Sequence, residues 1–315
     1  MSVNQAVIFT KPVHHLGIGL SPEELNQRLR CFFEEKGFRF VVRKKLTGPN
    51  LRARKIIPQH YLMYSAAACA ETVQVDASAK ERFEAYFGRS WQHEMDAGRI
   101  VPMPRLLSRP GIDAHQLYSA WLDLYAREKT VKLQAGLIMG FIEEWNVYGI
   151  NAFYPSLEEV FYHPETRIDY HVVEFDSSQT SWKEFRQNLL GTTNASTANP
   201  NSFRGKLYAD YPIKFPGRDN YAHGSAGPLE GMVERTIHEE DFDMTTNPVG
   251  ACLAERGVTR ESFSRWLQRQ PLATIGALFD ETEEKNTDET KLLILRSLGE
   301  DGDMDPSIFL NFRNA

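Results

Sequence analysis

A single histidine stands in the stretch NYAHGSAGP, residues 220–228, between an aromatic approach and a Gly-Pro turn. A neutral imidazole is a competent nucleophile at pH 7 when one ring nitrogen is available and an acceptor fixes the other. A strand end that leads into a Gly-Ser turn is suited to hold such a ring in a pocket. His223 is therefore a candidate nucleophile, and the alternative is a structural histidine in a turn.

Two cationic side chains are candidate ligands for phosphate. Lys11 follows an apolar run, and Arg204 stands in the stretch NPNSFRG, residues 199–205. Lysine acts as a point charge, whereas arginine donates a fork of hydrogen bonds to phosphate oxygens. Phosphoryl transfer depends mainly on positioning and charge neutralisation, so both residues suit that chemistry. Taken alone, Lys11 is also typical of a solvated lysine at the end of a strand.

Two groups of histidines and carboxylates raise the alternative of a metal site. The groups are His14 with His15, and His163 with Glu165, Asp169 and His171. Neither group has the spacing of a known zinc pattern. We therefore predict no metal site built from protein side chains.

The N-terminal part of the chain predicts a strand, a helix and a second strand. Residues 6–10, AVIFT, form a short apolar, β-branched and aromatic run that suits a buried strand. Ser21 is suited to cap the helix that follows, and Gly37 stands where a helix usually ends. Residues 38–46 then alternate well enough for a second strand.

The middle of the chain predicts mainly helices. Residues 77–95 have helical spacing of aromatic side chains, and residues 113–145 predict a long helical stretch. Residues 170–176 return to strand character. Residues 181–191 predict a helix that stops at its terminal glycine, and residues 228–241 predict an amphipathic helix.

Signals are weaker after residue 242. Residues 259–270 predict a helix, and the acidic residues 280–291 predict a solvated surface. The whole pattern favours the α+β class, with helices packed against a mostly antiparallel sheet.

Four short motifs follow one another in a defined order: Lys11-Pro12, residues 190–194, residues 200–205 and residues 220–225. Each motif alone is weak. Together they resemble nucleoside diphosphate kinases. In that family a Lys-Pro follows the first strand, a Leu-Gly-x-Thr-Asn-type stretch ends a helix, and a Pro-x-x-x-Arg-Gly loop comes next. An Asn-x-x-His-Gly-Ser strand end then carries the nucleophilic histidine.

The resemblance covers residues 5–65 and 168–240, and it implies a ferredoxin-like antiparallel sheet covered by helices. We expect a nucleoside diphosphate kinase-like domain over residues 1–241, with a helical insertion at about 66–131. A helical C-terminal extension is expected over residues 242–315.

The resemblance implies a phosphohistidine at His223, formed with a nucleoside triphosphate and discharged by a nucleoside diphosphate. Lys11 and Arg204 would contact the phosphates, and Lys11 would reach the ribose together with Asn220. Mg²⁺ would be carried by the nucleotide, as in Mg-ATP.

Further positions match the family pattern. Thr193 corresponds to a threonine that contacts a phosphate, and Tyr61 corresponds to a tyrosine near the catalytic histidine. Gly224 and Ser225 follow the histidine as they do in the family. Arg186 adjoins the position where the family has an arginine.

Three departures bear on turnover. Val13-His14 replaces the usual Asp-Gly, and Gln187 replaces the usual arginine. Alignment on the apolar Ile237 puts Thr236 where a glutamate is expected, with Glu234 as a substitute if the helix shifts. The alternatives are therefore a nucleotide-binding module without efficient turnover, or a kinase for an atypical acceptor.

Composition limits the classes of partner. The 315 residues carry a net charge of -6 with both signs interspersed, which argues against a general nucleic-acid binder. No apolar run reaches the length of a membrane span and no leader segment begins the chain, so a cytoplasmic protein is expected. The three cysteines share no metal-binding spacing and are expected to be reduced. Oligomers are usual in the family, so a homo-oligomer is a possible state.

Overall fold

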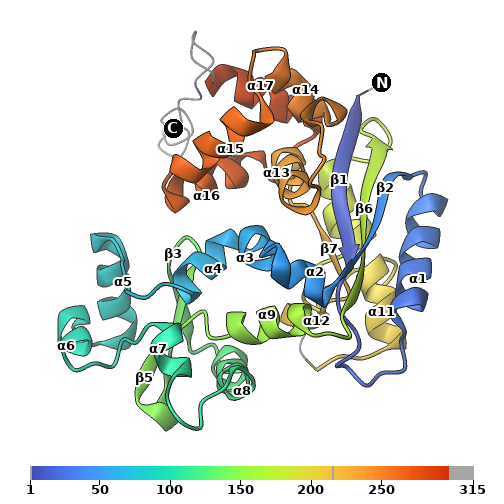
Figure 1. Ribbon diagram of the computed structural model, residues 1–315. Helices are drawn as coiled ribbons and strands as arrows, with labels where there is room; N and C mark the ends of the chain where they lie inside the picture. The colour runs from blue at the N-terminus through green and yellow to red at the C-terminus, as the bar shows by residue number, and fades with distance from the viewer. Residues whose placement is uncertain (1, 215, 298–315) are drawn as a thin grey trace. The chain divides into compact units, whose positions relative to one another are not determined.

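The computed structural model describes residues 2–214 and 216–297, which form two compact units. The first unit combines Met1–Ala53 with His163–Ala315, and the second unit is Arg54–Tyr162. Helices and strands occur in both (Figure 1), so the prediction of the α+β class is confirmed.

The first unit is built on a four-stranded antiparallel sheet with the order β2-β6-β1-β7 (Figure 1). Its strands are β1 (Val3–Thr10), β2 (Arg39–Thr47), β6 (Arg167–Asp176) and β7 (Ala222–Gly224). Counted along this sheet's own strands, the spatial order is 2-3-1-4, which is the ferredoxin-like order. The predicted ferredoxin-like sheet is therefore confirmed.

Strand β1 lies at the centre of this sheet. Phe9 is opposite Tyr170 of β6 on one side and opposite His223 of β7 on the other. The run from Ala6 to Phe9 is buried on both faces, which explains why it is continuously apolar rather than alternating.

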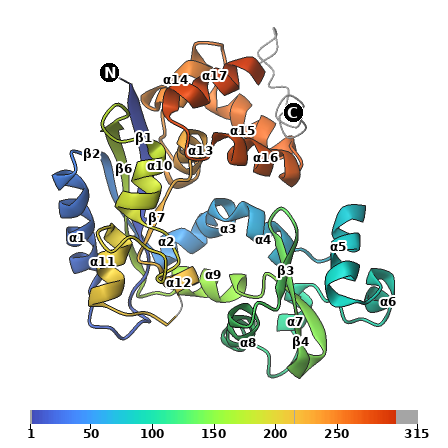
Figure 2. The ribbon, with the colours of Figure 1, turned by 180° about the vertical axis from the view of Figure 1, so that it is seen from behind.

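One face of the sheet is covered by the helices predicted after Ser21 and over residues 181–191, and by a helix where a Pro-x-x-x-Arg-Gly loop is expected (Figures 1 and 2). They are α1 (Pro22–Glu35), α10 (Trp182–Glu184), the π-helix η2 (Phe185–Leu190) and α11 (Phe203–Asp210). Ser21 caps α1 by accepting a hydrogen bond from the Glu24 amide at 3.1 Å, as expected. Gly191 ends the helical stretch at a φ of 90°, a conformation that favours glycine.

Helix α13 (Pro228–His238) packs on the other face, against β1, and joins the C-terminal helices in a second core (Figure 1). The remaining helices of the first unit are α2 (Gly48–Ala53), α12 (Pro216–Asp219), η3 (Met244–Thr246), α14 (Pro248–Ala254), α15 (Arg260–Arg269), α16 (Leu272–Thr282) and α17 (Thr287–Ser297). Helical structure is thus present where it is expected after residue 242, up to residue 297.

The second unit has its own three-stranded antiparallel sheet, in the order β3-β4-β5. Its elements are α3 (Ile56–His60), α4 (Leu62–Ala68), α5 (Ala77–Phe87), α6 (Trp91–Asp96), α7 (Met103–Leu107), α8 (Ala114–Ala126), β3 (Thr130–Gln134), β4 (Leu137–Ile142), η1 (Glu143–Trp145), β5 (Val147–Ile150) and α9 (Tyr154–Tyr162). Separate apolar clusters pack α5 and α6, and α7 and α8, against this sheet.

The prediction of one helical stretch over residues 113–145 is wrong. Helix α8 ends at Ala126, and a β-hairpin follows. The hairpin turns at Gly136, where φ is 70° and a side chain would overlap the Met63 carbonyl. An apolar run as short as LIMGF fits a helix or a strand equally well, and packing on both sides of β4 decides for the strand.

Helical spacing over residues 77–95 corresponds to two helices, not one. Gly88, at a φ of 63°, ends α5. The side chain of Ser90 then caps α6 by accepting from the His93 amide. The aromatic residues that suggested the helix do lie in one core, with Phe83 against Trp91 at a centroid distance of 5.1 Å.

The prediction of a solvated surface over residues 280–291 is wrong in part. Thr282, Thr287 and Thr290 are buried, and this stretch forms the end of α16 and the first turn of α17. The amide of Thr287 donates to the side chain of Asn4 at 2.9 Å. Acidic residues here are therefore interspersed with buried threonines, of which Thr287 attaches the segment to Asn4 of β1.

Within the described ranges, no helix is both long and apolar enough to cross a bilayer. The three cysteines are free thiols, as expected. The boundaries predicted at residues 66, 131 and 241 stay predictions, because a compact unit is not evidence of an insertion.

Candidate functional site

His223 lies on β7 at the edge of the first unit's sheet. Its side chain is only 15% exposed, and its ring stacks on Phe9 at 4.6 Å with an interplanar angle of 20°. The following residue, Gly224, packs so closely that a side chain there would overlap Leu190 and press on Phe185. Glycine therefore fits beside His223 without displacing the Leu190 side chain.

A glutamate on α13 fixes one nitrogen of the His223 ring. Nε2 lies 2.6 Å from Oε1 of Glu234, and Oε2 of the same carboxyl accepts a hydrogen bond from the Ser225 hydroxyl at 2.5 Å. The Ser225 oxygen also accepts from the Val7 amide at 2.9 Å, which ties the carboxyl to β1. The imidazole is therefore held in one orientation by a carboxyl that is itself held.

The alignment that put Thr236 at this position is wrong, and the substitute Glu234 occupies it. Thr236 instead donates its hydroxyl to the Val233 carbonyl of its own helix, at 2.7 Å. Helix α13 starts with Pro228 at its first turn, directly after Gly227. This start sets the rotation of the helix and directs Glu234 at His223.

Glu230 is a second carboxylate on the same face of α13, one turn before Glu234. Its Oε2 accepts a hydrogen bond from the Ala226 amide at 3.0 Å. Both carboxyls therefore lie beside the turn that follows His223. Neither was among the predicted catalytic residues, although two glutamates four residues apart on an apolar helix are a detectable signal.

Lys11 is buried immediately after β1, as its place in the Lys-Pro motif predicts. Its amide donates to the Tyr221 carbonyl at 2.7 Å, and Nζ donates to the Arg218 carbonyl at 3.1 Å. Burial lowers the pKa of Lys11 to about 7, and the positive charge of Arg204 adds to the shift. Lys11 is therefore near enough to Arg204 for their charges to interact.

Arg204 is buried on α11 and holds backbone carbonyls. It donates from Nη1 to Gly191 at 2.5 Å, from Nη2 to Ala222 at 2.5 Å and from Nε to Asn220 at 3.2 Å. The Asn220 side chain is buried and donates to the Gly217 carbonyl at 3.2 Å. Gly191, Arg204 and Ala222 each belong to one of the resembling motifs. Three of these motifs thus meet at the Arg204 guanidinium.

Charge and burial set the protonation of His223. Burial lowers its pKa to about 3, and the positive charges of Lys11, Arg204 and Arg186 act in the same direction, while Glu230 opposes them. Above about pH 3 the imidazole is therefore neutral. Three cations close enough to act on the ring also make its surroundings attractive to an anion.

Burial has the opposite effect on the two carboxyls. It raises the pKa of Glu234 to about 8, and with the neighbouring Glu234 charge it raises the pKa of Glu230 to about 7. Near neutral pH, one proton is shared in the short contact between Glu234 and His223. When Glu234 is ionised, its carboxylate accepts a hydrogen bond from Nε2–H of His223, which places the lone pair of the ring on Nδ1.

The turn after Lys11 is organised without the Asp-Gly that the resemblance expects. Val13 is buried in the core, and its carbonyl accepts from the Leu16 amide at 3.0 Å. Nε2 of His15 lies 3.1 Å from Oδ1 of Asp219, which also accepts from Nε of Arg218 at 2.6 Å. Asp219 was not predicted, although it directly precedes the motif that begins at residue 220.

Arg186 and Gln187 contact carboxylates of the C-terminal helices. Arg186 pairs with Glu283 and, at 3.4 Å, with Glu284. Gln187, where the resemblance expects an arginine, donates from Nε2 to both carboxyl oxygens of Glu284, at 3.1 and 2.8 Å.

Two predicted site residues remain, Thr193 and Tyr61. Thr193 is exposed in the loop after η2, where its carbonyl accepts a hydrogen bond from the Tyr208 hydroxyl at 3.0 Å. Tyr61 belongs to the second unit, between α3 and α4, and its ring lies 6.3 Å from that of Phe161. Their contacts with a nucleotide stay predictions.

The chain resembles nucleoside diphosphate kinases in fold. The Aquifex aeolicus enzyme is similar with a TM-score of 0.35 and 13% identity, over 75% of this chain and 94% of that chain. An NDP kinase from Pyrobaculum aerophilum has a TM-score of 0.36 and 15% identity, over 76% of this chain and 98% of that chain. The Borrelia burgdorferi enzyme, solved as a transition state mimic with bound vanadate and ADP, has a TM-score of 0.34 and 15% identity, over 76% of this chain and 89% of that chain. No family model and no curated protein matches the chain. Values this low describe a distant likeness of fold and carry no argument about activity.

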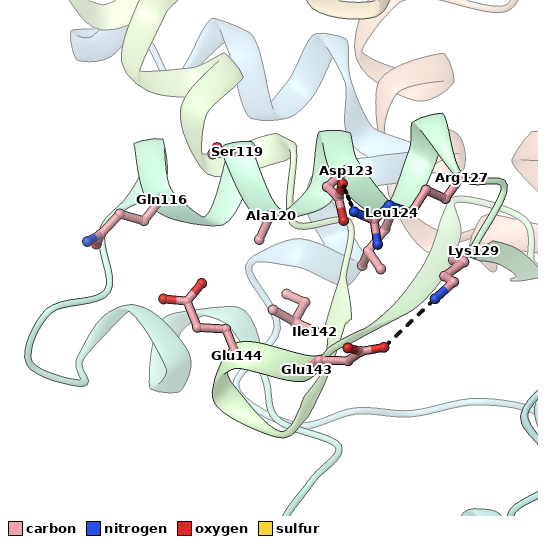
Figure 3. A pocket seen from close by; sticks show the side chains of 10 residues that line it. All are labelled: Gln116, Ser119, Ala120, Asp123, Leu124, Arg127, Lys129, Ile142, Glu143 and Glu144. Carbon is pink, nitrogen blue, oxygen red and sulfur yellow. Dashed lines mark ion pairs between the residues drawn. The ribbon is translucent and has the colours of Figure 1, made fainter.

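The second unit contains a pocket of about 360 Å³ between α8 and the end of β4 (Figure 3). Its charged side chains form two ion pairs, Asp123 with Arg127 at 2.8 Å and Lys129 with Glu143 at 3.8 Å (Figure 3). None of the ten residues that line it is a predicted site residue. The chemically organised group in the described part of the chain is therefore the one around His223.

Proposed function

We propose that this chain is a phosphotransferase that moves the terminal phosphoryl group of a nucleoside triphosphate to a nucleoside diphosphate through a phosphohistidine at His223. One observation carries the proposal: Nε2 of His223 is bound to the Glu234 carboxyl in a buried group whose charges include three cations. A neutral, oriented imidazole in a positive field suits attack on an anionic phosphate.

In the first step, Nδ1 of His223 attacks the γ-phosphorus while Nε2 keeps its proton directed at Glu234. A nitrogen–phosphorus bond forms, and the bond to the β,γ-bridging oxygen breaks. The electron pair leaves with the β-phosphate of the diphosphate product. In the second step the β-phosphate oxygen of another diphosphate attacks the phosphohistidine, and the nitrogen–phosphorus bond breaks.

The neighbouring residues have supporting roles in this proposal. Lys11 neutralises phosphate charge and, with Asn220, reaches the ribose. Arg204 holds the backbone around His223 and adds positive charge. Mg²⁺ enters with the substrate as Mg-ATP. The same chemistry would serve an atypical acceptor in place of a nucleoside diphosphate.

A second candidate is a nucleotide-binding module without efficient turnover. The observation that favours it is the Gln187 side chain, which stands where an arginine is expected and is bound to Glu284. Glutamine carries no charge to stabilise the transferring phosphoryl group, so binding would survive better than catalysis.

The test is the intact mass of the protein after incubation with Mg-ATP. The wild-type chain and His115→Ala, which removes an exposed histidine of the second unit, should both gain one phosphoryl group. His223→Ala should gain none, and added diphosphate should discharge the adduct. Calorimetric binding of Mg-ADP without any adduct would overturn the phosphotransferase proposal in favour of the binding module.

A further inference from the structure

The loop between α16 and α17, residues 283–286, lies on the turn that follows His223. The Glu284 amide donates to the Ala226 carbonyl at 2.9 Å. Gly227 faces the carbonyl of Thr282 so closely that a side chain there would overlap it. A segment distant in sequence is therefore packed on the backbone directly after β7.

Both β1 and α10 hold this loop at its end. The side-chain oxygen of Asn286 accepts from the Trp182 amide at 2.9 Å and from the Asn4 amide group at 2.8 Å. The side-chain oxygen of Asn4 in turn accepts from the Thr287 amide. Asn4 and Thr287 are buried, so the attachment is built into the fold.

The loop directs two carboxylates at the cationic side of the site. Glu283 and Glu284 pair with Arg186, and Glu284 also accepts from Gln187. Arg186 is one of the three cations whose charge acts on His223. Carboxylate and phosphate oxygens use the same guanidinium donors, so the loop acids and a phosphate compete for Arg186.

The backbone at this contact is unusual on both sides. Glu284 has a φ of 58°, a left-handed conformation that is uncommon for residues other than glycine. Arg186 lies in the π-helix η2, a rare form that occurs mostly as single turns and frequently at functional sites. Strained conformations persist where surrounding contacts hold them, and they are a starting point for a functional hypothesis.

We infer that the α16–α17 loop is an autoinhibitory contact, in which Glu283 and Glu284 occupy Arg186 and Gln187 until a polyphosphate ligand displaces them. The effect on catalysis rests on the proposed function, whereas the competition for anions does not. The side chain of Arg186 is 27% exposed, so a ligand in solution can reach it.

The test compares Glu283→Gln/Glu284→Gln with wild type, using calorimetric binding of inorganic tripolyphosphate and of Mg-ADP. The matched control is Glu255→Gln/Glu261→Gln, which removes two exposed carboxylates elsewhere in the C-terminal part of the chain, one after α14 and one in α15. Exposed ion pairs are weak, so the loop variant should bind about fivefold more tightly than wild type and control. Equal affinities in all three proteins would overturn the inference.

Hydrogen exchange on the wild-type protein gives a second test that needs no stable variant. Saturation with tripolyphosphate should speed exchange at the Glu284 amide, because its bond to Ala226 breaks when the loop leaves. Unchanged or slower exchange at that amide would show that the loop stays in place, and would overturn the inference.

The rate of phosphohistidine formation separates this inference from the proposed function. If the loop variant binds more tightly and neither protein forms an adduct, the competing loop is supported and the phosphotransferase proposal is overturned. If both proteins are labelled equally and bind equally, the phosphotransferase proposal is supported and the autoinhibitory loop is overturned.

Discussion

Two groups of histidines in the first unit have different surroundings. His223 stacks on Phe9, and a carboxyl holds its Nε2. His14 stacks on His163 at 4.7 Å and lies edge-on to His15 at 5.2 Å. Its Nδ1 is buried with no hydrogen-bond partner among the residues the structure describes.

Burial alone does not distinguish the two groups. It lowers the pKa of His223 to about 3 and that of His14 to about 4, so both rings are neutral at pH 7. Cations act on His223, whereas the groups that act on the pKa of His14, after burial, are His15, His163 and Glu165. In the proposed function, the oriented ring nitrogen and the surrounding cations are what distinguish His223 from the neutral, buried imidazole of His14.

The largest expected effect comes from removing the carboxyl that orients His223. Glu234→Gln should slow phosphohistidine formation roughly 100-fold, because a neutral amide cannot stabilise the positive charge that develops on the attacking imidazole as the carboxylate does. Single-turnover labelling with Mg-ATP measures the rate. Glu165→Gln, next to His163 in the other group, should stay near the wild-type rate, and equal losses in both variants would erase the distinction.

The labelling rate should rise with pH, as the raised pKa of Glu234 requires. The ionised carboxylate accepts the hydrogen bond from Nε2–H and stabilises the charge that develops on the ring, and the pKa of Glu234 is about 8. At saturating Mg-ATP, the rate constant should be about tenfold higher at pH 9 than at pH 7. A rate that falls over this interval would mean that the protonated carboxyl is the active form.

Nucleotide affinity should change with pH in the opposite sense to this rate. Burial lowers the pKa of Lys11 to about 7, so its charge is lost as the pH rises through neutrality. Binding of Mg-ADP should weaken about threefold between pH 6.5 and pH 7.5 in calorimetric titrations. Lys11→Arg keeps its charge and should flatten this dependence. A wild-type affinity independent of pH would contradict the role of Lys11.

The smallest effect is on stability, and it belongs to the second group. The unfolded state binds a proton at His14 below about pH 6.5, whereas the folded state does not until about pH 4. The free energy of unfolding should therefore fall as the pH decreases through this interval. In urea unfolding, the free energy of unfolding should decrease between pH 7.5 and pH 5 by about 1 kcal/mol less in His14→Gln than in wild type, after allowance for solvent screening. An identical loss in both proteins would assign the acid sensitivity to other residues.

The N-terminal elements were predictable because their local signals agree with their packing. Ser21 caps α1, and the apolar side of α1 packs in the core. The run AVIFT lies in the central strand β1. The hairpin at residues 130–142 was not predictable, since its apolar run is compatible with both helical and strand periodicity. Packing on both faces of β4 favours the strand. The π-helical form of η2 likewise has no signature in its composition.

In the site, the four motifs located His223, Lys11, Arg204 and Asn220 in one unit. The carboxyl partner was the harder part, because Glu234 and Thr236 differ only by the rotation of α13, which begins at its Gly227-Pro228 turn. The Arg186–Glu283 contact joins residues 97 positions apart, so no local pattern announces it.

The most direct test of the central claim is to find which nitrogen carries the phosphoryl group. Nitrogen–phosphorus correlation NMR on the ¹⁵N-histidine-labelled protein, after reaction with Mg-ATP, reports the bonded ring nitrogen. We predict a phosphoryl group on Nδ1 of His223, with Nε2 still protonated toward Glu234. A phosphoryl group on Nε2, or on any other histidine, would contradict the account.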